Sequence, residues 1–273
     1  MYKTVADAKN GYHQVRLDEE SSKLTTFLTE FGRYRYLRSP QGLRSSGDAY
    51  TRRFDEILVD IPRKHKVVDD CLLYDASIED SFFHTFDFLL TCAKNGVTLA
   101  EKKFKFCEKE VDFAGYHLGW EKYHPSSDIV SAIHNFPMPD NPTITDIRAW
   151  FGLVNQISPF YTSNEVMQPF HDLLKHESKE KNVYWDEHLK SAFVQSKKYL
   201  CDQAYKGLTY FDVKRNTCVV TDWSNKGIGF VIFQKKCICN ECNPFTCKDG
   251  WQLVYCGSRK LTTAERNYAP VEA

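Results

Sequence analysis

Two adjacent aspartates, Asp69 and Asp70, stand between the short apolar runs of residues 66–68 and 71–74. Carboxylates held side by side between two strands lose hydration and repel each other, so they are costly to keep unless a cation lies on them. A divalent metal such as Mg²⁺, which prefers carboxylate oxygens, would meet that need. Aspartate also favours tight turns, so a polar hairpin turn without a metal is the alternative interpretation.

A second group of potential ligands is made of cysteines. Cys237, Cys239, Cys242 and Cys247 fall within eleven residues. Four thiolates can bind Zn²⁺ tetrahedrally, although gaps of one, two and four residues are not a strong zinc pattern. Free thiols on a hairpin insertion are therefore the alternative. The first residues lack the apolar stretch of a secretory signal, so we expect reduced cysteines rather than disulfides.

Composition limits the partners of such sites. The 273 residues include 36 Lys or Arg and 36 Asp or Glu, so the formal net charge is zero. Nucleic-acid-binding proteins are more often basic, yet a local basic groove around an acidic centre would be compatible with a neutral total. No apolar run approaches the length of a membrane span. We expect no membrane partner and an intracellular location, cytoplasmic or nuclear.

Short strands and helices alternate in the first 122 residues, which predicts an α+β domain. Period-two alternation predicts a strand at 32–38, and the apolar runs beside the aspartate pair predict two more. Helical spacing predicts helices at 46–58 and 79–95. In the second of these, the apolar residues that recur every three or four positions are Phe82, Phe83, Phe86, Leu89 and Leu90.

Helices are also predicted beyond a proline-rich connector at 134–142. Thr145 and Asp146 can cap one helix, and a second runs from about 186 to 201 with Leu189, Phe193 and Leu200 facing inward. From 207 onward the chain is rich in strands, with apolar runs at 218–221, 228–233 and 252–256. These predict three antiparallel strands, the first two joined by a turn at 224–227.

A second acidic element lies at residues 7–14, where Asp7 ends a short apolar start and Gly11 turns the chain into an amphipathic stretch. The run Asp-Ala-Lys-Asn-Gly-Tyr-His-Gln resembles the first catalytic motif of gypsy-type LTR-retrotransposon reverse transcriptases. Residues 39–43, 49–54 and 113–116 resemble their following motifs, and the aspartate pair stands where the family has Tyr-x-Asp-Asp. The order of these motifs favours the metal-site interpretation.

This resemblance covers essentially the whole chain and implies an architecture and an activity. The fold would be α+β, with a reverse transcriptase palm built on an antiparallel sheet at 1–122. A helical thumb or connection would follow at 123–206, where residues 146–156 resemble the thumb motif. A truncated ribonuclease H-like β-sheet would occupy 207–273. The activity would be that of an RNA-directed DNA polymerase fragment of a retrotransposon Pol polyprotein.

The resemblance also assigns roles. Asp7 and Asp69 would bind two Mg²⁺ or Mn²⁺ ions that activate the primer 3′-hydroxyl, with Asp70 as a less direct third carboxylate. Tyr12 would exclude a 2′-hydroxyl and Gln41 would line the nucleotide pocket. A packed aromatic and an exposed loop amide are their respective alternatives. The partners would be an RNA/DNA template-primer, dNTPs and the remainder of the Pol polyprotein.

Two further sets of residues receive roles in the same way. Ala114 and Gly115 would form the primer grip. Asp222 follows residues 220–221 in a run that resembles the opening of ribonuclease H, where an Asp ending a buried strand is the first metal carboxylate. A turn-capping Asp222 is the alternative. Glu265 and Glu272 would have structural roles, because the next catalytic Glu of that motif would fall one residue beyond Ala273.

Departures from the family's pattern lead to an expectation of low activity. Val67 replaces the Tyr of Tyr-x-Asp-Asp, and the chain begins only six residues before Asp7, so most of the fingers subdomain is expected to be missing. We therefore expect weak primer extension and no ribonuclease H cleavage. A non-catalytic nucleic-acid-binding remnant, decayed or domesticated, is the alternative function. A zinc-dependent interaction module at the cysteines is a third possibility, but it leaves the acidic motifs unexplained.

Overall fold

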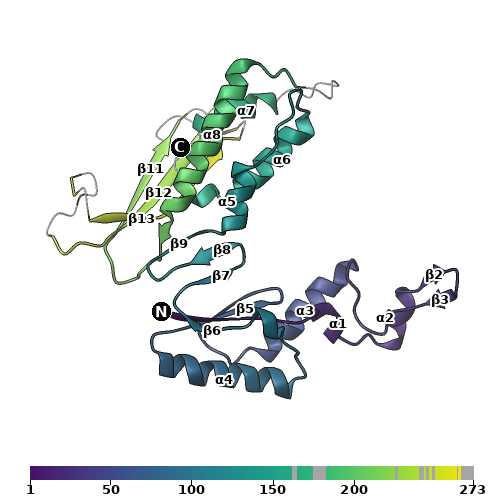
Figure 1. Ribbon diagram of the computed structural model, residues 1–273. Coiled ribbons are helices and arrows are strands. Elements are labelled where there is room, and N and C mark those ends of the chain that lie inside the picture. Colours follow the sequence, from purple (N-terminus) through teal and green to yellow (C-terminus); the bar gives the residue numbers. More distant parts are fainter. Residues whose placement is uncertain are drawn as a thin grey trace. The chain divides into compact units, whose positions relative to one another are not determined.

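The computed structural model describes residues 1–161, 165–174, 183–224, 227–239, 243, 246–247, 250–262 and 264–265 (Figure 1). Two compact units divide the chain, Met1–Ala114 and Gly115–Ala273. Helices and antiparallel sheets occur in both, so the predicted α+β class is confirmed. Among the helices that the structure describes, none is long and apolar enough to cross a membrane.

The first unit is built on a four-stranded antiparallel sheet. Its order is β4 (Lys64–Val67), β5 (Asp70–Asp75), β1 (Tyr2–Asp7) and β6 (Lys105–Glu108). The two strands predicted beside the aspartate pair are therefore confirmed. The first strand of the chain lies between two partners that come much later in the sequence, and its register places Asp7 opposite Asp70.

Two long helices, α3 (Arg44–Ile57) and α4 (Ile78–Lys94), confirm the helices predicted at 46–58 and 79–95. Their buried residues, among them Phe54 and Phe88, share a core with residues of β1 and β5. The remaining elements of this unit are α1 (Gly11–Gln14), α2 (Glu19–Leu24), β2 (Phe27–Thr29), β3 (Gly32–Tyr34), η1 (Glu101–Lys103) and β7 (Val111–Phe113).

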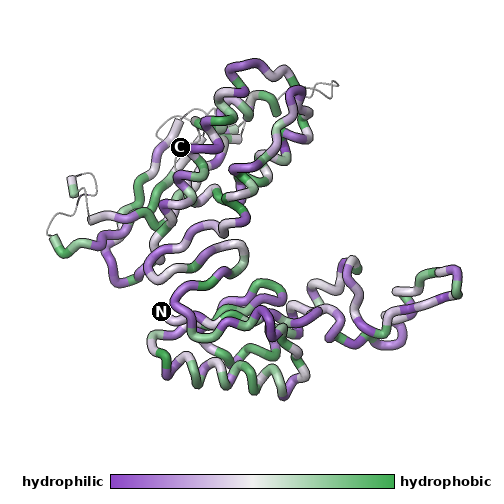
Figure 2. The backbone as a smooth tube through the Cα atoms, viewed as in Figure 1, coloured by the Kyte–Doolittle hydropathy of each residue, from purple (hydrophilic) through white to green (hydrophobic). Residues whose placement is uncertain are grey.

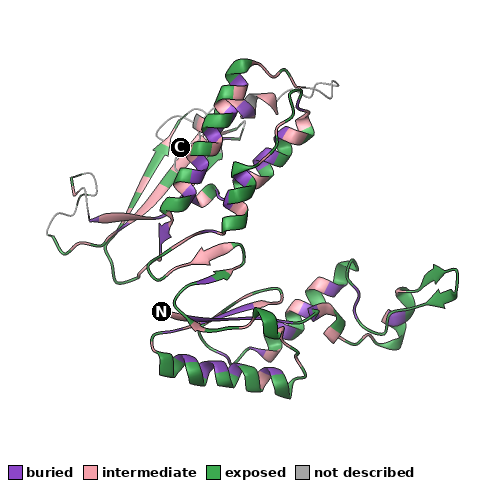
Figure 3. Ribbon diagram, in the orientation of Figure 1, coloured by how far each residue is buried: buried purple, intermediate pink, exposed green. Residues whose placement is uncertain are grey.

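Helix α4 packs on the sheet through its less apolar side. Hydrophobic residues recur along it, as Figure 2 shows, but Phe82, Phe83 and Phe86 are more than half exposed. The buried residues instead include His84 and Thr85. Figure 3 shows that the buried part of α4 is the side that faces the sheet. His84 Nδ1 lies 2.9 Å from Asp75 Oδ2 of β5. Polar pairs together with the buried Phe88, not the exposed apolar stripe, therefore face the sheet.

The second unit contains a short antiparallel sheet and a group of helices. Its strands β8 (Tyr116–Leu118), β9 (Lys122–Pro125) and β10 (Leu208–Thr209) adjoin in that order. The helices are α5 (Ser127–His134), α6 (Ile144–Asn155), η2 (Ser158–Phe160), η3 (Glu165–Met167), α7 (Gln168–Leu173) and α8 (Glu187–Lys206). Leu189, Phe193 and Leu200 of α8 are buried, as predicted, around the fully buried Trp150.

Helix α6 begins earlier than its predicted cap at Thr145 and Asp146. Thr143 is the N-cap residue, and its hydroxyl accepts a hydrogen bond from the Asp146 backbone N–H. The Asp146 carboxylate accepts one in return from the Thr143 backbone N–H at 2.8 Å. The prediction of Thr145 as a cap was wrong, because a reciprocal capping box needs the two residues three positions apart.

The second unit also contains the three predicted antiparallel strands, β11 (Thr217–Trp223), β12 (Gly227–Lys235) and β13 (Trp251–Lys260). Backbone hydrogen bonds between Ser224 and Gly227 close the predicted turn. Strand β11 is at the sheet edge and is largely exposed among the residues described. The compact units do not coincide with the domain ranges 1–122, 123–206 and 207–273. Compactness does not define a family domain, however, so those ranges stay predictions.

Candidate active site

Three carboxylates of the first unit converge at the ends of neighbouring strands. Asp7 ends β1, Asp69 lies in the turn after β4, and Asp70 begins β5. One ligand oxygen from each lies within 4.8 Å of the others. Antiparallel pairing of β1 with β5 brings Asp7 opposite Asp70, and the Ala8 backbone N–H donates to the Asp69 carbonyl at 3.0 Å. The spacing is suited to a shared metal, because carboxylate oxygens are the ligands that Mg²⁺ prefers.

Negative charge accumulates in this carboxylate cluster. Asp7 is buried, and the Lys103 ammonium lies 2.7 Å from its Oδ2. Burial, followed by the hydrogen bond and charge of Asp7, raises the pKa of Asp70 to about 6. The hydrogen bond with Asp7 in turn raises the pKa of Lys103. The cluster therefore favours a nearby cation, and the side chain of Lys103 provides one.

The turn that carries Asp69 has an unusual backbone. Val67 pairs with Asp70, so Val68 and Asp69 alone form the turn. Val68 has a φ of 56°, a left-handed conformation that a β-branched residue adopts only at a cost. Backbone conformations of this kind cost about 1–3 kcal/mol and gather at functional sites. The aspartate pair is thus presented by a strained two-residue turn.

A pair of aromatic rings lies close enough to the carboxylates for the charges of Asp69 and Asp7 to act on one of them, Tyr50. Tyr12 of α1 and Tyr50 of α3 meet edge to face with ring centroids 5.4 Å apart. The Tyr50 hydroxyl is buried without a hydrogen-bond partner among the described residues, and burial together with the charge of Asp69 raises its pKa. A Cβ added at Gly11 would lie 2.6 Å from the Tyr50 ring. Glycine at position 11 therefore leaves room for this ring.

Two residues of this region had no predicted role, Gln14 and Lys103. The Gln14 side-chain amide donates to the carbonyls of Lys9 and Thr98, at 2.6 and 2.9 Å, and its oxygen accepts from the Thr98 N–H. These hydrogen bonds hold the segment around Thr98, which precedes η1, next to α1. Gln14 is the last residue of the motif at 7–14, so the sequence could have identified it as part of the site. Nothing in the sequence distinguishes Lys103 from the neighbouring lysines.

The other residues predicted for the polymerase site are placed as follows. Tyr12 is half-buried against Tyr50, near the carboxylates. Gln41 is exposed in the turn before α3, next to Gly42, whose φ is 87°. Ala114 and Gly115 are exposed and have φ values of 49° and 82°. Tyr12 thus packs on Tyr50, on which the charges of the carboxylate cluster act, whereas Gln41, Ala114 and Gly115 are exposed.

Asp222 lies in quite different surroundings. It is exposed on β11, opposite Gly229, and its Oδ1 accepts a hydrogen bond from the Trp223 N–H at 3.0 Å. The described residues of β11 are exposed or half-buried, whereas the resemblance implies an Asp at the end of a buried strand. Among those residues, Asp222 belongs to no group of three or more potential metal ligands.

Structural roles were expected for two glutamates, Glu265 and Glu272. Glu265 forms two hydrogen bonds with the Arg259 guanidinium, at 2.7 and 2.8 Å, and accepts another from the Thr262 N–H. The bond from Arg259 and those from Thr262 lower the pKa of Glu265 to about 2. Its carboxylate is therefore held by local partners. Glu272 lies outside the described residues.

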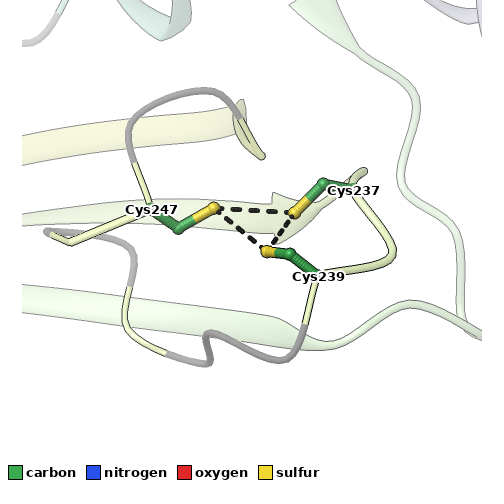
Figure 4. A group of neighbouring side chains, drawn as sticks. All are labelled: Cys237, Cys239 and Cys247. Carbon is green, nitrogen blue, oxygen red and sulfur yellow. Dashed lines mark hydrogen bonds between the residues drawn. The ribbon is translucent and has the colours of Figure 1, made fainter.

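Three of the four predicted zinc ligands also converge. Figure 4 shows the thiols of Cys237, Cys239 and Cys247 pointing toward one another. Their sulfurs are 2.9 Å apart for Cys237 and Cys239, and 3.5 Å apart for the two pairs with Cys247. Cys242 lies outside the described residues. The two convergent groups thus differ in chemistry, one offering hard oxygen ligands and the other soft sulfur ligands.

Comparison with known families agrees with the motifs. Residues 1–118 match the family model "Reverse transcriptase (RNA-dependent DNA polymerase)", and residues 185–273 match the "RNase H-like domain found in reverse transcriptase". The carboxylate cluster therefore lies in the first matched range, and Asp222 and the cysteines lie in the second.

Relatives of this chain include Pol polyproteins of mobile elements. It is 28% identical to the retrovirus-related Pol polyprotein from transposon gypsy of Drosophila melanogaster, over 98% of the chain and 25% of that protein. The corresponding polyprotein of transposon 297 is also 28% identical, over 99% of the chain and 24% of the relative. The chain thus spans about a quarter of the length of these relatives.

Solved structures with the same fold come from foamy virus. The foamy viral protease-reverse transcriptase dRH in complex with ds DNA matches 99% of this chain and 45% of its own, with a TM-score of 0.82 at 20% identity. The corresponding complex with RNA/DNA hybrid matches 99% of this chain and 34% of its own, with a TM-score of 0.81. The chain therefore joins a reverse transcriptase domain to an RNase H-like domain, and it resembles gypsy-type retrotransposon Pol polyproteins over nearly its whole length.

Proposed function

We propose that this chain catalyses RNA-directed DNA synthesis, with nucleotidyl transfer at Asp7, Asp69 and Asp70. The observation that carries the proposal is the convergence of three carboxylates within 4.8 Å, inside the range that matches the reverse transcriptase family. Structural carboxylates seldom gather in this way unless a cation balances them. The substrates would be a template-primer of RNA and DNA together with dNTPs.

The donor set fits two Mg²⁺ or Mn²⁺ ions, held by Asp7 and Asp69 with Asp70 as the third carboxylate. Such ions would activate the primer 3′-hydroxyl and stabilise the departing pyrophosphate. In this proposal Lys103 neutralises Asp7 until metal binds, since its ammonium is mostly exposed and free to move away from that carboxylate. Tyr50 and Gly11 hold the floor of the site in place.

Substrate contacts are proposed for residues around the cluster. Tyr12, which packs on Tyr50, would exclude a 2′-hydroxyl from the incoming nucleotide. Gln41 would line the nucleotide pocket, and Ala114 with Gly115 would support the primer end. Double-stranded DNA and RNA/DNA hybrid in the complexes of the foamy viral relatives support a nucleic-acid duplex as the partner. The remainder of a Pol polyprotein is a further proposed partner.

Asp222 is proposed as one metal ligand of a ribonuclease H site, and cleavage of RNA in a hybrid by this chain alone is still expected to be absent. The match of residues 185–273 to an RNase H-like domain supports this role. Its exposed carboxylate is compatible with metal binding. Further carboxylates would have to join it, because two-metal hydrolysis needs several ligands.

Primer extension on an RNA template tests the polymerase proposal. Losing one metal ligand removes several kcal/mol of transition-state stabilisation, so Asp69→Asn should reduce extension at least about 100-fold. Asp48→Asn is the matched control, since Asp48 is exposed on α3, and it should leave extension unchanged. A Mn²⁺ titration by electron paramagnetic resonance reports on the site independently of turnover. Equal extension and equal Mn²⁺ binding by Asp69→Asn and the unaltered chain would contradict the proposal.

A further inference from the structure

The connection between β12 and β13 brings together three thiols that the polymerase and ribonuclease H proposals do not use. Cys237 and Cys239 follow β12, Cys247 precedes β13, and their sulfurs lie 2.9 to 3.5 Å apart (Figure 4). Cys239 is exposed, and Cys237 and Cys247 are half-buried. A group of three sulfurs facing one point is the arrangement of a soft-metal site.

The backbone around these sulfurs is built to admit them. Gly250 is buried, and its carbonyl accepts hydrogen bonds from the N–H groups of Lys236 and Cys237. A Cβ at position 250 would lie 2.6 Å from the Cys247 sulfur and closer still to that of Cys237. The Cys247 N–H donates to the Asn243 carbonyl at 3.1 Å. Only glycine leaves room beside the thiols, so their convergence is part of the local packing.

Apolar burial does not explain this convergence. Ile238, between the first two cysteines, is fully exposed, with a relative exposure of 103%. In contrast, Cys71 and Cys92 are 1% exposed within the apolar core of the first unit. Thiols are weak hydrogen-bond donors, so contacts among three of them contribute little at an exposed loop. A bound metal would supply the missing stabilisation.

We propose that Cys237, Cys239 and Cys247 bind one Zn²⁺ ion as thiolates and thereby fix the connection between β12 and β13. Each thiol would lose its proton to solvent as its sulfur–zinc bond forms. Sulfur ligands select zinc over the magnesium expected at the carboxylates. With Zn–S bonds of about 2.3 Å, tetrahedral sulfurs lie about 3.8 Å apart, so the two 3.5 Å pairs are close to the required spacing.

The remaining features of the loop are compatible with this site. Cys237 and Cys239 must separate by about 1 Å to reach tetrahedral spacing, which side-chain rotation can provide. The Lys235 ammonium donates to the Cys239 carbonyl, so a positive charge lies beside the group that would carry the thiolates.

Metal analysis of the intact chain, purified with reductant and trace zinc, tests the proposal. We expect about one zinc per chain, falling below about 0.2 in the Cys239→Ser/Cys247→Ser double variant. Cys218→Ser is the matched control, since Cys218 lies half-buried on β11 away from the cluster, and it should retain zinc. Gly250→Ala should weaken binding by crowding the sulfurs.

Cobalt substitution keeps the test valid if a cysteine variant fails to fold. Co²⁺ added to the unaltered chain should give thiolate-to-metal charge-transfer absorption, and zinc should displace it. Zinc retained by the double variant would overturn the proposal. So would copper in place of zinc, or a Cys237–Cys239 disulfide that persists under reductant with no metal bound.

Discussion

The aspartates at the end of β1 and at the end of β11 carry equally clear motifs, yet their surroundings differ. Asp7 lies on a central strand, is buried, and meets two other carboxylates and an ammonium. Asp222 lies on an edge strand, is exposed, and accepts a hydrogen bond from the neighbouring Trp223 N–H. A motif therefore identifies a candidate ligand, whereas the pairing of strands decides whether other ligands reach it.

Metal binding should show the largest difference between the two regions. Asp7→Asn removes the buried carboxylate at the centre of the cluster, so we expect Mn²⁺ affinity to fall at least about 100-fold, or about 3 kcal/mol. Asp222→Asn should change the Mn²⁺ affinity of the carboxylate cluster less than about twofold. Asp222 is not part of that cluster, nor of any other group of potential metal ligands among the described residues. Electron paramagnetic resonance of free Mn²⁺ measures both. Equal losses of Mn²⁺ affinity in the two variants would show that the surroundings of Asp7 and Asp222 do not differ in metal binding.

A smaller effect is expected from adding one methyl group in each region. Gly11→Ala would push a Cβ to within 2.6 Å of the Tyr50 ring, which is itself buried, and should destabilise the first unit by about 1–3 kcal/mol. Gly229→Ala, opposite Asp222, meets nothing closer than 3.7 Å and should be neutral or slightly stabilising. Hydrogen exchange of α3 and β12 amides reports each unit separately. Tolerance of Gly11→Ala would show that the floor of the site is loosely packed.

The smallest effect should come from the strained turn before β5. Val68→Gly introduces glycine, which adopts a φ of 56° more readily than any other residue. The substitution should stabilise the β4–β5 hairpin by about 1 kcal/mol. Val67→Gly is the control, because Val67 lies within β4 and should lose about 1 kcal/mol. Hydrogen exchange of the β5 amides compares the two variants. A loss of protection in both would mean that the turn at Val68 carries no strain.

Helix α4 illustrates what periodicity can and cannot predict. Apolar residues every three or four positions gave the correct element, within one residue at each end. The same pattern did not say which side packs, and Phe82, Phe83 and Phe86 are exposed. The side that packs carries Thr85, which bonds to Thr4, and His84. The Thr85–Thr4 pair spans 81 positions and the His84–Asp75 pair spans nine, and the apolar periodicity reveals neither.

The carboxylate cluster was predictable by resemblance but not by pattern alone. Apolar runs predicted the strands beside Asp69 and Asp70, yet the pairing of Asp7 with Asp70 depends on the register of β1 against β5. That register is a tertiary property. The contact between Lys103 and Asp7 also spans 96 positions, so nothing local marked Lys103. The capping box at Thr143, in contrast, was detectable from its spacing to Asp146 and was missed.

The central place of β1 has a consequence for how the protein is made. Lys3 is synthesised before both of its strand partners, Tyr74 on one side and Glu108 on the other. Long-range pairing of this kind slows folding, because the chain must close large loops before these contacts form. A nascent chain therefore exposes Asp7 without its partners while most of the first unit is being translated. The carboxylate cluster therefore assembles only when the sheet does.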